Sequence, residues 1–104
     1  MTLKIKRRRP DAQLHGRATE QAAGLDLYAW CEEEMVLQPL ERKLVPTGIA
    51  IELPAGSAGM VYARSGQALR KGLAMANGVG VIDADYRGEV AVPVVNLSNT
   101  ALRI

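Results

Sequence analysis

The stretch ANGVGVIDADYRGEV, residues 76–90, decides how this 104-residue chain is organised. A mostly β-branched run at residues 79–82 leads into two carboxylates, Asp83 and Asp85, and a second apolar run follows at residues 90–95. Apolar runs on both sides of a segment that contains Asp and Gly predict a hairpin, with one strand before the turn and one after it.

The two carboxylates are the first candidates for chemistry. In an extended segment, residues i and i+2 project to the same side, so Asp83 and Asp85 are expected side by side. Two close carboxylates raise the proton affinity of one of them, which suits a general base or a site for a hydrated cation. The alternative is a solvated turn in which Asp and Gly only satisfy backbone geometry.

Length and composition limit the class of protein. A chain of 104 residues, 48% hydrophobic and 23% charged, is typical of one globular domain. A net charge of +2 is too small to indicate binding to nucleic acid or to a membrane surface. No run has the length of a transmembrane helix, and no signal peptide is recognised. With a single cysteine, Cys31, and therefore no internal disulfide, we expect a protein of the reducing cytoplasm.

Metal and nucleophile chemistry based on Cys or His has little support. The single cysteine, Cys31, excludes an internal disulfide and a cysteine-rich metal site. The only histidine, His15, lies in a polar segment without the partners of a zinc site or a Ser-His-Asp triad. Because the chain is short and has no Phe and one Trp, oligomerisation is expected to add buried area.

Alternating runs predict the other strands. In residues 23–29, Leu25 and Leu27 share one side and Asp26 the other, so Asp26 faces either water or a site. Further strands are expected at residues 3–6, 35–37, 42–53 with a bend at Pro46 and Gly48, 60–63, 90–97 with Pro93 at an edge or bulge, and at the C-terminal end. Many short strands without a βαβ rhythm predict an all-β barrel or sandwich.

One short helix is expected at residues 66–71, with Ser65 as N-cap and Gly72 at its C-terminal cap. Arg64, Ser65 and Gly66 together form a candidate phosphate cradle from a guanidinium, a hydroxyl and backbone N–H groups. The alternative is a capped helix with a surface arginine. Asn77 can match the edge of a base, although an asparagine in a Gly-rich turn needs no such role.

Three segments together resemble motifs one, two and three of the trimeric dUTP pyrophosphatase (dUTPase) family, in the same order: AGLDLYA at 23–29, ARSG at 63–66 and NGVGVIDADYRGEV at 77–90. PTGIAIELPAG at 46–56 is similar to the strand pair before motif two. The resemblance implies one all-β domain over residues 1–104, a distorted jelly-roll β-barrel with one short helix. It also implies a homotrimer with sites at subunit interfaces.

The resemblance implies hydrolysis of dUTP to dUMP and pyrophosphate with Mg²⁺. Asp83 matches the catalytic aspartate, which orients and deprotonates the water that attacks the α-phosphate. Asp26 matches the aspartate that holds waters on the Mg²⁺. Arg64, Ser65 and Gly66 match the segment that contacts the phosphates.

The nucleoside half of the substrate is implied to bind at the third motif. Asn77 matches the residue that reads the uracil edge, with backbone groups around Val81 and Ile82 completing the pocket. Tyr86 matches the tyrosine that packs on the deoxyribose and leaves no room for a 2′-hydroxyl. Arg87 and Asp85 are interpreted as structural residues that pin the hairpin.

The chain also departs from the family pattern. Ala63 stands where a proline is usual, and Gln67 where a leucine is common. The sequence ends at Ile104, before the family's motif four strand and its motif five arm, so we expect a domain that lacks these last strands. One alternative is therefore a weak or inactive nucleotide-binding or interaction module. A second is a dCTP deaminase relative, whose family has Ile-Asp-Pro-Gly-Trp at residues 82–86.

Overall fold

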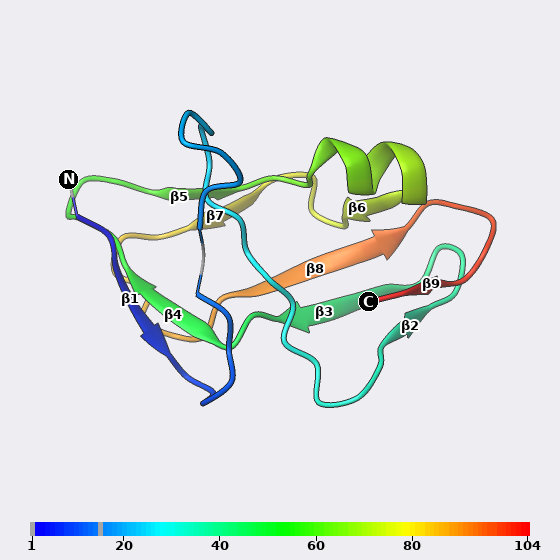
Figure 1. Ribbon diagram of the computed structural model, residues 1–104, viewed down its shortest axis with the longest axis horizontal. Coiled ribbons are helices and arrows are strands. Elements are labelled where there is room, and N and C mark those ends of the chain that lie inside the picture. Colours follow the sequence, from blue (N-terminus) through cyan, green and yellow to red (C-terminus); the bar gives the residue numbers. More distant parts are fainter. Residues whose placement is uncertain (1, 15) are drawn as a thin grey trace.

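The computed structural model describes residues 2–14 and 16–104 of the chain, and Figure 1 shows it as strands with one short helix. In chain order the elements are β1 (Lys4–Arg7), β2 (Val36–Leu37), β3 (Arg42–Pro46), β4 (Ile49–Glu52), β5 (Gly59–Val61), the helical segment η1 (Gln67–Lys71), β6 (Leu73–Met75), β7 (Gly80–Ile82), β8 (Ala91–Asn96) and β9 (Leu102–Arg103). The predicted all-β class with one short helix is confirmed.

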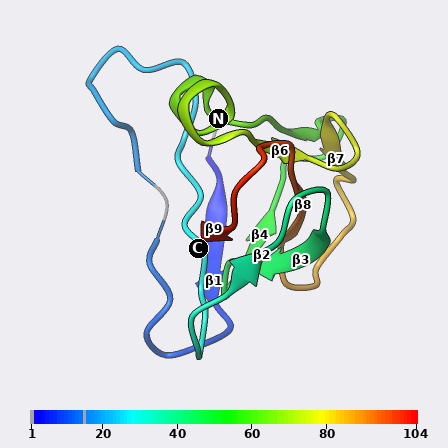
Figure 2. The ribbon, with the colours of Figure 1, turned by 90° about the vertical axis from the view of Figure 1, so that its right-hand side faces the viewer.

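The described strands form four small antiparallel sheets. The pairs are β1 with β4, β2 with β9, and β5 with β7, and β8 lies between β3 and β6 in the fourth sheet. Figure 2 shows the cyan part of the chain ahead of β2 running along the outside of these sheets. No described helix is both long and apolar enough to cross a membrane.

The core lies where β2, β3 and β8 meet. Leu37, Val45 and Val94 are buried against one another, one from each of these strands. Beside them, Asn96 is fully buried, and its amide N–H groups donate to the carbonyls of Leu37 at 3.0 Å and Thr100 at 2.8 Å. Asn96 therefore ties the end of β8 to β2 and to the turn before β9.

The bend predicted at Pro46 and Gly48 is confirmed, because β3 ends at Pro46 and β4 begins at Ile49. Gly48 has a φ of +74°, and a Cβ placed there would lie 2.7 Å from the Cβ of Ala12. Only glycine accommodates both the positive φ and this close approach. Between the two strands, buried Thr47 donates its hydroxyl to the Val90 carbonyl at 2.6 Å.

The hairpin predicted within residues 76–90 is wrong. β7 pairs with β5, whereas β8 pairs with β3 and β6, so the two strands belong to different sheets. The expected edge position of Pro93 is also wrong, since β8 is the middle strand of its sheet. Pro93 is tolerated because it lies just beyond the residues of β8 that pair with β6, where its missing N–H interrupts no bond to that strand.

Two other expectations fail in detail. Residues 23–29 form no regular strand, and their one pairing is an isolated bridge between Asp26 and Gly16. The N-cap of η1 is Gly66 rather than Ser65, and no side chain caps the helix. The C-terminal prediction is confirmed, because Gly72 adopts a left-handed φ of 73° and its N–H bonds back into the helix.

Candidate functional site

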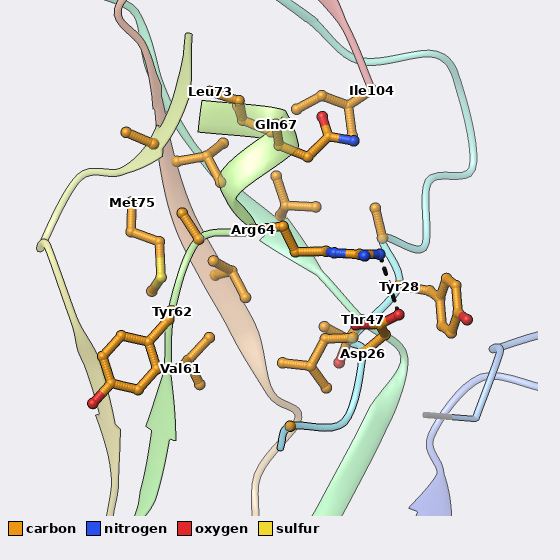
Figure 3. Close-up of a pocket in the computed structure, with 18 of the residues that line it drawn as sticks. Asp26, Tyr28, Thr47, Val61, Tyr62, Arg64, Gln67, Leu73, Met75 and Ile104 are labelled. Atoms are coloured by element: carbon orange, nitrogen blue, oxygen red, sulfur yellow. Dashed lines mark hydrogen bonds and ion pairs between the residues drawn. The ribbon is translucent and has the colours of Figure 1, made fainter. Parts of the chain in front are cut away.

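A cavity of about 810 Å³ opens between the segment at residues 22–29, the end of β5 with the start of η1, and strands β6 and β8 (Figure 3). Much of its wall is apolar, with Val61 and Leu73 among the residues that line it. Two charged side chains meet in this cavity, Asp26 and Arg64. The fold thus brings together two of the predicted site residues that lie far apart in the sequence.

Asp26 and Arg64 form an ion pair across the cavity. Arg64 Nη1 lies 3.2 Å from Asp26 Oδ2, and Figure 3 shows the arginine side chain extended toward the carboxylate. The Asp26 N–H donates to the Gly16 carbonyl at 2.7 Å, which fixes its backbone. The Arg64 side chain is 66% exposed and the Asp26 side chain 22%, so the guanidinium remains available to an incoming anion.

Ser65 and Gly66 follow Arg64 directly and are exposed at the start of η1. Neither residue lines the cavity. The Arg64 carbonyl accepts a hydrogen bond from the Ala68 N–H at 3.0 Å, which orders the backbone of this segment. Arg64 is therefore held between β5 and a short helical turn, and the exposed Ser65 follows it directly.

Asp83, the predicted catalytic residue, lies in an exposed turn directly after β7. The Tyr86 N–H donates to the Asp83 carbonyl at 3.1 Å, which closes the turn. The segment therefore forms the exposed turn of the alternative interpretation, and not the extended arrangement that would place Asp83 and Asp85 side by side. Arg87 holds this turn rather than the expected hairpin, since its Nη1 donates to the carbonyls of Ala84 at 2.7 Å and Tyr86 at 3.1 Å.

Tyr86 is folded back over the same turn. Its hydroxyl donates to the Glu89 carbonyl at 2.8 Å, and a Cβ at Gly88 would lie only 2.6 Å from that hydroxyl. Glycine at position 88 is therefore required for this placement of the ring. The tyrosine side chain is still 45% exposed, so one surface of it is available for contact.

The residues predicted to read the base lie around β7. Asn77 is exposed, and its Nδ2 is 3.7 Å from the position of a Cβ at Gly80. Val81 is 62% exposed, while Ile82 is half-buried against Gly59. Gly80 itself is closely packed, because a Cβ there would lie 3.1 Å from Met75 Cε and 3.4 Å from Val61 Cβ.

Arg64 and Asp83 lie at opposite ends of the β5–β7 pair. The register places Ile82 opposite Gly59 and Gly80 opposite Val61. Asp83 therefore leaves one end of the pair, whereas Arg64 follows the other end, on the side of η1 (Figure 1). At about 3.3 Å per residue of extended backbone, the separation along the pair is on the order of 20 Å.

The described part of the chain offers few side chains that could bind a metal ion. Among residues 2–14 and 16–104, no group of three or more His, Cys, Asp or Glu side chains could hold an ion. His15, set aside as a zinc or triad residue from the sequence, lies outside the described residues. A single carboxylate such as Asp26 fits Mg²⁺ only when phosphates and waters supply the other ligands.

Sequence reasoning missed the network around Glu89. Its carboxylate accepts hydrogen bonds from Arg9 Nε at 3.2 Å and from the Gly48 N–H at 3.3 Å. Arg9 in turn lies over the ring of Trp30, 4.0 Å from its centroid. Arg9 belongs to a basic triplet that is usually interpreted as a solvated strand end, so nothing in the sequence marked it.

Comparison with known proteins gives a consistent result. The family model described as dUTPase matches residues 11–104. The deoxyuridine 5′-triphosphate nucleotidohydrolase of Cytophaga hutchinsonii is 55% identical over 86 residues, which cover 83% of this chain and 56% of that protein. The chain thus spans just over half the length of the first curated relatives it matches, at 56% and 57%.

Solved structures agree with these matches. A mutant dUTPase from phage phi11 of S. aureus, described as showing the coordination of a structural Mg(II) ion, superposes with a TM-score of 0.84 at 28% identity. That match covers 94% of this chain and 61% of the phage chain. A mutant dUTPase of Staphylococcus bacteriophage 80alpha with dUpNHpp gives a TM-score of 0.82 at 29% identity, over 92% of this chain and 59% of the other.

Proposed function

This chain belongs to the dUTPase family, and from that premise we propose that it hydrolyses dUTP to dUMP and pyrophosphate with Mg²⁺ as cofactor. The observation that carries the proposal is the Asp26–Arg64 pair in a cavity on one side of the fold, together with the exposed turn from Asp83 to Tyr86. Arg64 provides the fixed cation and Asp83 the accessible base that phosphoryl transfer needs.

In this proposal Asp83 takes the proton of a water molecule and directs its oxygen toward the α-phosphorus. The bond from the α-phosphorus to the bridging oxygen breaks, and pyrophosphate leaves with the electron pair. Negative charge on the leaving group is stabilised by the Arg64 guanidinium and by hydrogen bonds from the Ser65–Gly66 segment. The exposure of the Asp83 turn keeps the carboxylate accessible to water.

Asp26 is the residue that fits Mg²⁺, through water molecules on an ion held mainly by the triphosphate. Bound Mg²⁺ supplies charge neutralisation on the phosphates. Because Asp26 pairs with Arg64 in the structure, the two side chains hold each other in place before substrate arrives. Substrate binding then replaces the carboxylate partner of Arg64 by phosphate oxygens.

Base and sugar recognition is proposed at the other end of the β5–β7 pair. Asn77 donates to and accepts from the uracil edge, with the backbone at Val81 and Ile82 beside it. Tyr86 packs on the deoxyribose. Since its hydroxyl is already bonded to the Glu89 carbonyl, the ring is held in one orientation before the sugar binds.

We propose that the two groups meet between copies of the chain in a homotrimer. An extended separation on the order of 20 Å is too long for Arg64 and Asp83 to act on one α-phosphate within a single chain. A site that takes Arg64 from one copy and Asp83 from the next removes this problem. Exposed apolar side chains on the β5–β7 pair, with Met60 51% and its cross-strand partner Val81 62% exposed, support association there.

The proposal is tested by pyrophosphate release from dUTP with Mg²⁺, using dTTP, UTP and dCTP for comparison. We expect selective release from dUTP, loss of release in Asp83→Asn and near-normal release in the matched control Asp85→Asn. Binding of the non-hydrolysable imido analogue of dUTP is measured in parallel. Binding of the analogue without any release of pyrophosphate would refute hydrolysis and favour a nucleotide-binding module. Conversion of dCTP to dUTP and ammonia would favour a deaminase.

A further inference from the structure

Glu89 connects the Tyr86 turn to the opposite part of the fold. Its backbone carbonyl accepts the Tyr86 hydroxyl at 2.8 Å, while its carboxylate accepts Arg9 Nε at 3.2 Å and the Gly48 N–H at 3.3 Å. The Glu89 side chain is 23% exposed, which strengthens these bonds relative to a fully solvated pair. One residue thus contacts both the proposed sugar-binding tyrosine and two fixed donors.

The donors of this network are themselves anchored. The Arg9 guanidinium lies 4.0 Å from the centroid of the Trp30 ring, a cation–π contact. The Trp30 backbone N–H donates to the Pro46 carbonyl at 2.8 Å, and its indole N–H donates to Asp11. Arg9 is therefore held against the end of β3, so the Glu89 carboxylate has a fixed partner.

The strand that follows Glu89 does not depend on this carboxylate. Val90 is buried, its N–H donates to the Ile49 carbonyl at 2.8 Å, and its carbonyl accepts both the N–H and the hydroxyl of Thr47. These bonds hold the Val90 end of the peptide whose carbonyl accepts the Tyr86 hydroxyl. The Glu89 end of the same peptide is held by the bonds from Arg9 and Gly48 to the carboxylate.

We propose that Glu89 is a positioning residue for Tyr86: its carboxylate, held by Arg9 and Gly48, fixes the Glu89 end of the peptide whose carbonyl receives the phenol hydroxyl. Through that bond Glu89 sets how sharply the site separates deoxyribose from ribose, an effect that rests on the proposed function. Loss of the carboxylate leaves the strand in place but lets the phenol ring move. A 2′-hydroxyl then meets less resistance.

The first test needs no nucleotide and no activity. The chain is labelled with 3-fluorotyrosine, and its three tyrosine signals are assigned by substitution to Phe. We expect the Tyr86 fluorine signal to shift or broaden in Glu89→Ala and in Arg9→Met. It should stay unchanged in Arg8→Met, a control that removes the same charge from the exposed neighbouring residue. A Tyr86 signal in Glu89→Ala that matches the wild type overturns the proposal.

The second test measures selectivity. The affinities of the imido analogues of dUTP and UTP are compared in the wild type, Glu89→Gln and Glu89→Ala. We expect the preference for the deoxy analogue to fall about fivefold or more in Glu89→Ala, as expected for the loss of one oriented hydrogen bond. Glu89→Gln keeps an oxygen for the Gly48 N–H, so it should restore part of the preference.

The two tests separate the two claims. If the wild type binds both analogues equally, the proposed function fails, while the fluorine signal still decides whether Glu89 positions Tyr86. If the wild type prefers the deoxy analogue and Glu89→Ala keeps the full preference, the positioning role is overturned and the proposed function stands.

Discussion

The Asp26–Arg64 ion pair predicts that loss of the Asp26 charge changes nucleotide affinity in opposite directions without a metal and with Mg²⁺. Replacing Asp26 by Asn keeps the size of the side chain and removes its charge. In the structure the carboxylate lies 3.2 Å from Arg64 Nη1, so a triphosphate without a metal must compete with it for the guanidinium. With Mg²⁺ present, the same carboxylate is proposed to hold waters on the ion, so its loss should weaken binding.

The magnitude follows from the exposure of the pair. Arg64 is 66% exposed, and ion pairs of this kind contribute about 0.2–1 kcal/mol. Asp26→Asn should therefore tighten metal-free binding of the imido analogue by up to about fivefold. In Mg²⁺ the loss of one water-mediated contact should weaken binding by about three- to tenfold. The ratio of the affinities with and without Mg²⁺ thus falls by about four- to fiftyfold.

Isothermal titration of the analogue in EDTA and in Mg²⁺ measures both changes on one sample. Asp85→Asn, which removes an exposed carboxylate outside the cavity, is the matched control and should change neither affinity. If Asp26→Asn weakens binding equally in both conditions, the carboxylate acts on the shape of the site. The competition argument and the Mg²⁺ role are then both refuted.

Three further substitutions test catalysis and stability. Asp83→Asn should leave analogue binding nearly unchanged and reduce pyrophosphate release by about 10²–10⁴-fold, and wild-type turnover in that variant would remove the residue from the mechanism. Asn96→Ala should lower the free energy of unfolding in urea by about 2–4 kcal/mol, because it removes one buried and one partly buried hydrogen bond and leaves the Leu37 carbonyl without the amide donor. A loss below about 0.5 kcal/mol would contradict this account. Gly48→Ala should lower the free energy of unfolding more than Gly56→Ala does in the same assay. Both glycines have a positive φ, but only at position 48 would a Cβ lie 2.7 Å from the Cβ of Ala12. Equal losses would show that this contact relaxes freely.

Local features of the fold were predictable from the sequence. The bend at Pro46 and Gly48 and the end of the helix at Gly72 depend on residues with restricted or unusual backbone preferences. The partners of the strands were not predictable. The pattern around Asp83 marked two strands correctly, but alternation carries no information on which strand lies beside which, so a hairpin was expected where β7 and β8 belong to different sheets.

The candidate site also contains residues that were predictable from the sequence and residues that were not. Asp26 and Arg64 were individually marked by an acidic residue in an apolar run and by an Arg-Ser-Gly segment, and only the resemblance to a family placed them in one site. Glu89 and Arg9 were not marked, because charged residues at strand ends are usually solvated. Their pairing depends on a contact between distant parts of the chain, which a single sequence does not reveal.

The position of Arg64 and Asp83 at opposite ends of the β5–β7 pair has a consequence for genetics. A site assembled from two copies needs an intact Arg64 from one and an intact Asp83 from the other, never both from the same polypeptide. In the proposed trimer, two inactive alleles, one lacking each residue, are therefore expected to complement each other when they are expressed together. With random mixing of equal amounts, about one quarter of the proposed sites would receive both intact halves, so a cell carrying two defective copies of the gene is expected to retain activity that neither allele supplies alone.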